Sequence, residues 1–320
     1  MHIAIVVLNW NGKQDTLECL QSLKNLHYSP YSVIVADNGS SDGSLDAIAS
    51  LYPEVQLLNN QKNLGFAEGN NRAITFALQK GFDALLILNN DTVVEPNLLT
   101  ALASASQENP HAIFGCVPYL FSQKNVLDHL GGVWNPLTAQ FDLISYRQQV
   151  FSPPPSLDYV CGCSLFAPSD AFKKIGLFDP RFFLFWEESD FCHRAKQNGY
   201  TLKICPEAKL WHKVSASFSG GKPHTSYFWW RNRLLWIEKN IPRKQRLSLY
   251  MTTLLPEIAK LHKHYLLKCL HLLPYFLFKS SAFPLKKTQL RIYAASLLGV
   301  YHYLLRRFYN GPSWLFQKKN

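Results

Sequence analysis

Residues 85 to 96 read "LLILNNDTVVEP", and this stretch decides the class of fold. Its first four aliphatic residues predict a buried strand, which is typical of the parallel sheets of α/β proteins. The strand then turns abruptly to Asn89, Asn90 and Asp91. Ligands of parallel sheets bind at the carboxyl ends of the strands, so these three residues are candidates for a binding site.

The sequence before this strand repeats the same plan. Short apolar runs at 3–9, 32–38 and 55–60 alternate with segments whose apolar residues recur at helical spacing. Strands that alternate with helices in this way predict a mainly parallel sheet flanked by helices. Beyond it, residues 110–170 indicate short β-segments, and a helix is expected at about 187–198, ended by Gly199.

Every predicted strand of this sheet is followed by a polar loop. The loops read "NWNG", "DNGSSDGS", "NQKNLGFAEGNN" and "NNDT". One such loop alone is better explained as an Asx turn or a helix cap. Four at one sheet edge favour a ligand site.

The sequence also limits how that ligand is held. It contains neither GxxxxGK[ST] nor GxGxxG, so a phosphate-bearing ligand must be neutralised by something other than a glycine-rich loop. A carboxylate beside amides, as at Asp91, suits a hard divalent cation that bridges to phosphate oxygens.

Charge is divided unevenly along the chain of 320 residues, whose net charge is +11. Residues 231–320 carry 17 Lys or Arg and 2 Asp or Glu, whereas residues 1–230 carry 16 and 20. The basic C-terminal part is expected to meet an anionic surface. The seven cysteines are scattered without paired CxxC spacing, which predicts reduced, mostly buried thiols.

Two amphipathic helical runs fill this basic part, one around residues 247–265 and one around 290–308. Their uncharged cores are shorter than the roughly 20 residues that a membrane-spanning helix needs. We therefore expect helices that lie in the membrane interface. Their apolar faces are too extensive for a contact with phosphates alone, so no nucleic acid partner is expected.

An ordered set of motifs gives a resemblance to a known family. The motifs are "VVLNWNG", "VADNGSSDGS", "NLGFAEGNN", "LNND", "GLFDPRFFLFWEESDFCHRAKQNGY" and "WHKVSASF", and they cover roughly residues 1–235. The chain thereby resembles inverting family 2 glycosyltransferases of the GT-A fold, in the rhamnosyltransferase-like branch of bacterial polysaccharide assembly. The resemblance implies a Rossmann-like α/β fold, Mg²⁺ or Mn²⁺, a nucleotide-sugar donor such as dTDP-rhamnose or a UDP-sugar, and a glycan or lipid-linked acceptor.

The resemblance and the charge pattern together imply a division of the chain. Residues 1–105 would form a nucleotide-sugar-binding half and residues 106–235 an acceptor-binding half. Residues 236–320 would form a basic, helical, membrane-associating tail. Because no signal peptide is evident at the N-terminus, the protein is expected peripherally at the cytoplasmic face of the cell membrane.

Site residues follow from the matching motif positions. Asp91 would hold the metal, and His212 would complete its coordination, although a histidine in this context is also often simply packed. Asn89, in the first position of the family's DxD motif, would contribute only hydrogen bonds. The resemblance assigns donor binding to Asn9, Asn11, Asp37, Asn63, Gly65, Asn89 and Asn90.

The "WEESD" segment resembles the family's acidic motif, in which the second acid is the catalytic base. That position is Glu188 here, one methylene longer than the usual Asp, and Glu187 and Asp190 remain alternatives. Asp190 is expected mainly to pair with Arg194 at i,i+4. Acceptor binding is assigned to Gly162, Glu187 and Arg231; lipid headgroups are an equal alternative for the arginines around Arg231.

Two other functions stay open at this point. A nucleotidyltransferase acting on sugar phosphates also uses metal-bound carboxylates, but the basic, glycine-rich loop that it needs after the first strand is missing. A non-enzymatic, membrane-associated nucleotide-sugar-binding protein would explain the tail but would leave the polar strand ends without a catalytic role.

Overall fold

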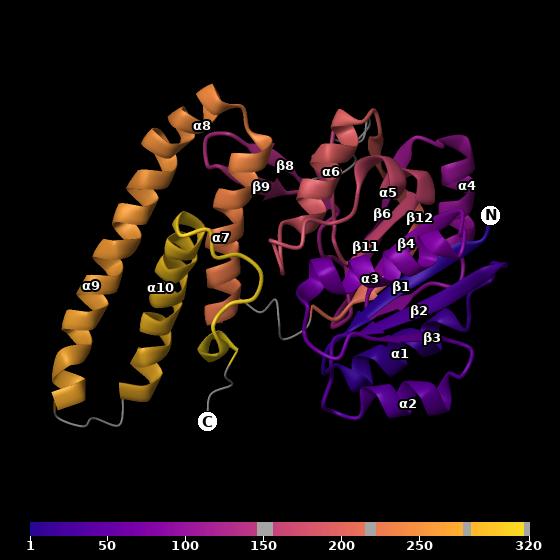
Figure 1. The fold of residues 1–320 in the computed structure, drawn as a ribbon, viewed down its shortest axis with the longest axis horizontal. Helices are drawn as coiled ribbons and strands as arrows, with labels where there is room; N and C mark the ends of the chain where they lie inside the picture. Colours follow the sequence, from indigo (N-terminus) through magenta and orange to yellow (C-terminus); the bar gives the residue numbers. More distant parts are fainter. Residues whose placement is uncertain (146–155, 215–221, 278–282, 317–320) are drawn as a thin grey trace. The chain divides into compact units, whose positions relative to one another are not determined.

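The computed structural model describes residues 1–145, 156–214, 222–277 and 283–316. It divides into two compact units (Figure 1). The sheet unit contains Met1–Trp134, Phe141–Pro180 and Glu187–Ser215. The helical unit contains Asn135–Gln140, Arg181–Trp186 and Ala216–Asn320. Residues 222–235 thus group with the C-terminal helices, while the predicted functional boundary at 235 stays a prediction.

The parallel half of the sheet unit confirms the predicted alternation of strands and helices. Each predicted strand is present within a residue or two of its expected bounds. The elements are β1 (Ile3–Asn9), α1 (Lys13–Leu23), β2 (Tyr31–Asp37), α2 (Ser44–Leu51), β3 (Gln56–Asn59), α3 (Gly65–Gln79) and β4 (Ala84–Asn89). Strands β2, β1 and β4 are parallel neighbours, and β3 continues the sheet beyond β2.

The rest of the sheet is mixed in direction. Its order is β3-β2-β1-β4-β11-β6-β12-β5, with β11 antiparallel to β4 and β12 parallel to β6. The remaining elements of this sheet and its surroundings are β5 (Thr92–Val94), α4 (Leu98–Glu108), β6 (Ala112–Leu120), β7 (Gln123–Leu127), β11 (Ser164–Pro168), α5 (Ser169–Ile175), α6 (Glu187–Gln197) and β12 (Thr201–His212). A smaller sheet contains β8 (Gly131–Asn135), β9 (Gln140–Leu143) and β10 (Tyr159–Val160).

Alternate residues of β1 pack into two separate cores, because neighbouring side chains of a strand point to opposite faces of the sheet. Ile3, Ile5 and Val7 pack in one core with residues of α1, α2 and α4. Ala4 and Val6 pack in the other with residues of α3, α5 and α6. Burial of both faces leaves the strand ends as the sheet surface where polar side chains can gather.

The helical unit is built from α7 (Pro223–Asn240), α8 (Arg243–Leu249), a π-helical turn (Tyr250–Leu254), α9 (Leu255–Leu277), α10 (Phe283–Leu304) and a short 3₁₀ helix (Ser313–Leu315). Pro223 occupies the first turn of α7, where its missing N–H costs nothing. The first amphipathic run does not form one buried face. Leu254 and Leu261 are buried, but Leu247 and Met251 are exposed. Among the described residues, no helix is both long and apolar enough to cross a bilayer.

Candidate active site

The polar strand ends lie at one edge, as the register of the sheet shows. Asn9 at the end of β1 is paired with Asp37 of β2, and Asp37 with Asn59 of β3. On the other side, Leu8 is paired with Asn89 of β4. The predicted gathering of these residues at one edge is confirmed.

Asn9 joins the loops that follow β1 and β2. Its Nδ2 donates to Asp37 Oδ2 at 2.6 Å and to Ser40 Oγ at 3.1 Å. Its Oδ1 accepts from Thr16 Oγ1 at 2.8 Å and from the Gly12 N–H at 3.2 Å. Both Asn9 and Asp37 are fully buried. They therefore order the loops in this structure, and their direct contact with a donor stays a prediction.

The other predicted donor-binding residues belong to the same loops. Asn11 accepts the Ser41 N–H at 2.8 Å. The side chain of Asn63 accepts the Gly65 N–H at 2.8 Å, where α3 begins. Gly65 has a φ of 81°, which glycine adopts most readily.

Asn90 turns back toward the loop after β1. Its Nδ2 donates to Thr16 Oγ1 at 2.9 Å. A Cβ added to Gly12 would meet this nitrogen at 2.6 Å, so the close approach requires a glycine. The adjacent Asn89 donates its N–H to the Cys163 carbonyl at 2.9 Å, which ties the end of β4 to the segment before β11.

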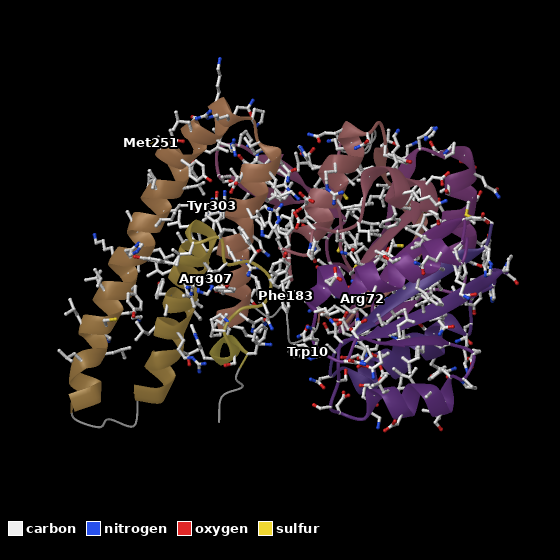
Figure 2. The ribbon with its side chains drawn as sticks, viewed as in Figure 1. Trp10, Arg72, Phe183, Met251, Tyr303 and Arg307 are labelled. Carbon is white, nitrogen blue, oxygen red and sulfur yellow. The ribbon has the colours of Figure 1, made fainter. Side chains whose placement is uncertain are left out.

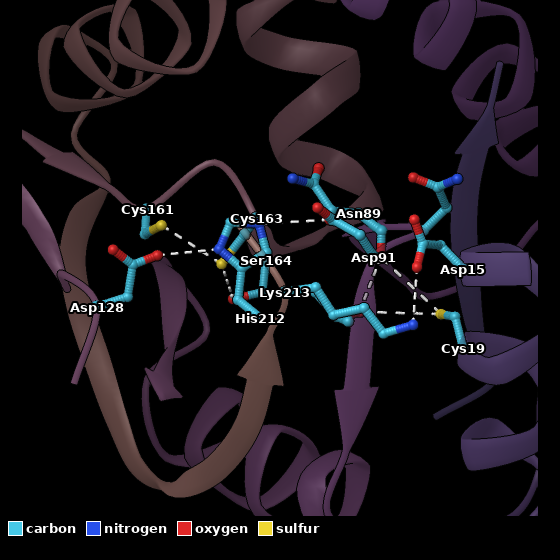
Figure 3. A network of polar contacts seen from close by, with 12 residues as sticks. Asp15, Cys19, Asn89, Asp91, Asp128, Cys161, Cys163, Ser164, His212 and Lys213 are labelled. Atoms are coloured by element: carbon cyan, nitrogen blue, oxygen red, sulfur yellow. Dashed lines mark hydrogen bonds and ion pairs between the residues drawn. The ribbon is translucent and has the colours of Figure 1, made fainter. Parts of the chain in front are cut away.

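Asp91 and His212, far apart in sequence, meet in space (Figure 3). Antiparallel pairing of β12 with β5 places His212 opposite Thr92, next to Asp91. His212 Nε2 lies 3.3 Å from Asp91 Oδ1, and His212 Nδ1 lies 2.9 Å from Asp128 Oδ2. Both Asp91 and His212 are 4% exposed. Burial alone would lower the pKa of His212, but its bonds to Asp128 and Asp91 raise it to about 10.

Lys213 fixes the strand end that carries this histidine. Its backbone N–H donates to the Asp91 carbonyl at 2.9 Å. Its Nζ lies 2.7 Å from Asp15 Oδ1 (Figure 3). The same Nζ lies 2.5 Å from Glu18 Oε2, and both carboxylates belong to α1. The two carboxylates neutralise the ammonium group, so Lys213 links β12 to α1.

Glu188 and Gly162 form the second part of the site. A Cβ added to Gly162 would lie 3.2 Å from Glu188 Cγ and 3.3 Å from its Cδ, so the glycine leaves room for this carboxylate. Glu188 Oε2 is buried and has no hydrogen-bond partner among the described residues. Burial and the nearby Cys161 raise the pKa of Glu188, while the Glu188 N–H and His129 lower it, and the net result is a pKa of about 7. A carboxyl tuned in this way is suited to take up a proton near neutral pH.

The two neighbouring acids differ from Glu188. Asp190 is fully buried and pairs with Arg194, whose Nε donates to Asp190 Oδ2 at 2.9 Å. The predicted i,i+4 pair is thus confirmed. Glu187 is also buried, and burial and the charge of Glu188 hold its pKa well above the usual range. Its predicted contact with the acceptor stays a prediction.

Arg231, which was predicted to bind the acceptor, makes packing contacts in this structure. Its guanidinium is fully buried in the helical unit and donates to the carbonyls of Tyr309, Arg181 and Phe182 at 2.6, 3.0 and 2.8 Å. Nε donates to Asn232 Oδ1 at 3.0 Å. These contacts give Arg231 a packing role, and its predicted contact with an acceptor stays a prediction. Local sequence does not reveal that the segment around α7 is buried.

The sequence alone did not indicate that Asp128 and Lys213 belong to the site. Asp128 falls in a region without clear periodicity, and only the pairing of β12 with β5 and β6 brings the histidine near it. Lys213 directly follows the candidate ligand His212, and this position was the one signal in the sequence that could have indicated it. Its acidic partners lie about two hundred residues earlier, so no local pattern shows the contact.

The model of the Glycosyl transferase family 2 domain matches residues 4–176, more than half of the chain. The chain belongs to glycosyl transferase family 2. It is therefore an enzyme of the glycosyltransferase class. The family is favoured over the nucleotidyltransferase and the non-enzymatic binding protein that the sequence left open.

Relatives of this family 2 glycosyltransferase include rhamnosyltransferases. It is 28% identical over 276 residues to the N-acetylglucosaminyl-diphospho-decaprenol L-rhamnosyltransferase of Mycobacterium tuberculosis, covering 73% of this chain and 88% of the relative. It is 22% identical over 281 residues to the dTDP-rhamnosyl transferase RfbF of Shigella flexneri, covering 83% and 92%. The glycosyltransferase is thus rhamnosyltransferase-like.

Solved structures establish the fold as GT-A. The mannosyltransferase PcManGT from Pyrobaculum calidifontis, in complex with GDP-Man and Mn²⁺, matches with a TM-score of 0.56 at 16% identity, covering 95% of this chain and 87% of that one. S. aureus TarS 1–349 in complex with UDP-GlcNAc matches with a TM-score of 0.55 at 13% identity, covering 97% and 93%. The likeness to these two proteins concerns the fold.

Proposed function

We propose that this glycosyltransferase moves a sugar from a nucleotide-sugar donor to an acceptor hydroxyl in a single displacement that inverts the anomeric configuration. The observation that carries the proposal is Glu188, whose buried carboxylate stands against Gly162 and has a pKa of about 7. In its ionised form it would remove the proton from the acceptor hydroxyl as that oxygen attacks the donor sugar.

The residues at the end of β4 fit a divalent cation by their chemistry. Asp91 offers a carboxylate oxygen, and His212 offers an imidazole nitrogen once that nitrogen has released its proton; the two atoms lie 3.3 Å apart. The bond from Asp128 to the other ring nitrogen sets the orientation of the imidazole, an arrangement common around metal-bound histidines. No group of three or more His, Cys, Asp or Glu side chains in the described residues is arranged to hold a metal.

We therefore assign Asp91 and His212 as two protein ligands of Mg²⁺ or Mn²⁺, with water and the donor diphosphate supplying the others. When bound, the cation would offset charge that develops on the diphosphate leaving group. Mn²⁺ is present in the PcManGT structure, which supports this assignment by fold.

The donor is proposed to be dTDP-rhamnose. Support comes from the names of the two rhamnosyltransferase relatives, one of which names this nucleotide and the other a lipid diphosphate-linked sugar as acceptor. The loops around Asn9, Asn63 and Asn90 would hold the nucleotide at the strand ends. The acceptor would be a glycan linked to a lipid diphosphate, and the pathway the assembly of a cell-surface polysaccharide.

An exposed stripe on the helical unit supports a membrane surface as the place of this reaction. We define the leucine stripe as the exposed residues Leu247, Met251, Leu255, Leu266, Leu270 and Leu273 of α8, the π-helical turn and α9. They recur mostly every three or four residues, and exposed Lys244, Lys260 and Lys263 lie in the same helices. In Figure 2, Met251 projects from the surface of this unit. Apolar residues flanked by lysines are typical of peripheral binding to anionic lipid.

We accordingly propose that the enzyme binds peripherally to the cytoplasmic face of the cell membrane, where it would meet a lipid-linked acceptor. Not all the basic charge contributes, since Arg231 and Arg233 are buried. Arg306 is paired with Glu238 at 2.6 Å. The exposed basic residues, which include Arg243 and Arg307 besides the lysines, are therefore the groups that would face lipid headgroups.

The direct test is release of nucleoside diphosphate by the purified full-length enzyme. dTDP-rhamnose, UDP-glucose and GDP-mannose are compared with Mn²⁺, with Mg²⁺ and with a chelator. We expect turnover with dTDP-rhamnose that the chelator abolishes and that Asp91→Asn lowers by about 10²-fold or more. Turnover that resists the chelator would remove the metal assignment, and preference for another donor would remove the rhamnose assignment.

A further inference from the structure

Two cysteines of the sheet unit face each other in a tight turn. The Ser164 N–H donates to the Cys161 carbonyl at 3.2 Å, so residues 161–164 form a turn between β10 and β11. The turn places Cys161 Sγ 3.4 Å from Cys163 Sγ (Figure 3). Both thiols are reduced, and each residue is 3% exposed. The catalytic proposal gives neither thiol a role.

His129 stands beside the first thiol, with its Nε2 3.6 Å from Cys161 Sγ. The hydrogen bond between the two thiols, together with His129, holds the pKa of Cys161 well below its usual range despite burial. Burial alone would lower the pKa of His129, but Cys161, Asp128 and Glu188 raise it to about 9. The pair therefore favours a thiolate next to an imidazolium, and a thiolate is the reactive form of cysteine.

The turn touches both parts of the active site. On one side, the Cys163 carbonyl accepts the Asn89 N–H at 2.9 Å, next to the strand end that carries Asp91. On the other side, Gly162 lies between the two cysteines and directly against Glu188. A change in the shape of this turn would move groups at both ends of the site.

We propose that Cys161 and Cys163 are a redox-sensitive pair that forms an intramolecular disulfide on exposure to hydrogen peroxide, and that this disulfide lowers sugar transfer. The effect on transfer rests on the proposed function. The disulfide itself does not, because it follows from the geometry of the two thiols alone.

The chemistry balances with the peroxide as oxidant. The Cys161 thiolate attacks one peroxide oxygen, so an S–O bond forms, the O–O bond breaks and hydroxide leaves with a proton from His129 as water. The Cys163 sulfur then attacks the sulfenic acid at Cys161; an S–S bond forms, the S–O bond breaks, and the thiol proton leaves with the departing oxygen as a second water. The two sulfurs together lose two electrons, and the peroxide gains them.

Forming this bond requires the turn to tighten. The sulfurs must close from 3.4 Å to the ~2.05 Å of a disulfide. Gly162 moves with them, and its contact with Glu188 leaves little free space. A displacement of catalytic groups by ~1 Å typically costs ~10²-fold in rate. We therefore expect oxidation to lower the transfer rate by about tenfold or more.

Peptide mass provides a readout that is independent of activity. No Lys or Arg lies between residues 148 and 172, so one tryptic peptide carries both cysteines and no others. The full-length enzyme is treated with hydrogen peroxide, alkylated and digested. We expect this peptide to become two hydrogens lighter and resist alkylation, and to recover both thiols after dithiothreitol. Transfer activity should fall and recover in parallel.

Two variants complete the test. Cys161→Ser lacks the thiolate that attacks the peroxide and cannot form the bond, so its activity should change little on oxidation, relative to its own reduced form. Cys269→Ser is the matched control, and it should behave as the wild type does. Thiols at 161 and 163 that stay open to alkylation, or that oxidise only to sulfonic acid, would overturn the disulfide. If the disulfide forms and transfer is unchanged, the regulatory claim is wrong; absence of any transfer in the reduced enzyme would instead count against the proposed function.

Discussion

Asp128 illustrates how one residue outside the predicted motifs completes the site. Its carboxylate binds the ring nitrogen of His212 that faces away from Asp91, so it fixes the orientation of the ring, as the proposed metal site requires. Asp128→Asn keeps the shape and removes the charge. We expect Mn²⁺ affinity, measured by calorimetry, to fall about 10- to 100-fold. Asp46→Asn, at an exposed carboxylate on α2, is the control. Equal metal affinity in the two variants would refute the orienting role.

Glu188 makes a prediction about pH. It is surrounded by Glu187 on its own helix, by Cys161 and His129, and by Tyr159 of β10, and burial raises its pKa to about 7. Because the ionised form is the base, kcat should rise with pH through about 7 and then level off. A rate independent of pH between 6 and 8 would contradict this assignment.

The same shift has a cost in stability. Between its ordinary value of 4.5 and about 7, the carboxyl of Glu188 binds a proton in the folded state that the unfolded state has lost. The free energy of unfolding should therefore fall as pH rises through this window. Glu188→Gln has no carboxyl to ionise and therefore avoids this loss of stability. Its melting temperature, measured by scanning fluorimetry, should exceed that of the wild type at pH 8, and the difference should shrink at pH 5. A constant difference would show that the shift is absent.

At the scale of elements, buried arginines fix α7 to neighbouring segments of the helical unit. Arg233 Nε donates to the Ala139 carbonyl at 2.8 Å, and its NH1 lies 2.6 Å from Glu257 Oε2 on α9. Together with Arg231, it ties α7 to segments 135–140 and 181–186, which are far apart in sequence. These arginines satisfy carbonyls that would otherwise be buried without a donor.

Arg231→Lys tests this structural assignment. Lysine cannot reproduce the planar fork, so at least one of the carbonyls should lose its donor, at about 1–3 kcal/mol. We expect a lower melting temperature and an unchanged KM for the acceptor. Arg243→Lys, at an exposed position of α8, is the control. Normal stability combined with a raised acceptor KM would instead support the acceptor-binding prediction.

The elements also show what sequence can predict. The ends of β1, β2 and β4 were predictable because an apolar run that stops at Asn or Asp is a local signal. The contact of His212 with Asp91 depended on family resemblance, since β12 reaches β5 only through long-range pairing. The burial of Arg231 could not be predicted, because burial of a charged helix residue depends on partners such as Phe182 and Tyr309, which no local pattern specifies.

For the whole molecule, the division of charge found in the sequence remains a prediction about membranes. The leucine stripe should insert shallowly into a bilayer, and the exposed lysines should add a salt-dependent attraction to anionic lipid. The wild type should therefore float with vesicles that contain phosphatidylglycerol, and less so at high salt. The triple variant Leu266→Ser, Leu270→Ser, Leu273→Ser should bind about tenfold more weakly or worse, because it removes apolar burial.

A matched variant controls for hydrophobicity. Leu51, Leu137 and Leu143 are exposed leucines outside the stripe, and their replacement by Ser should leave flotation unchanged. If both triple variants float equally well, the stripe is not the membrane-binding surface. Flotation that resists high salt would show that apolar burial outweighs the lysines.

The central claim is that Glu188 takes the proton of the acceptor, and one comparison tests it most directly. Wild type and Glu188→Gln are measured side by side for donor binding and for single-turnover transfer to a lipid-linked acceptor with Mn²⁺. The amide keeps the shape of the carboxylate but cannot accept the proton, so donor affinity should be unchanged and the transfer rate should fall by about 10²-fold or more. Transfer by Glu188→Gln at close to the wild-type rate would contradict the claim.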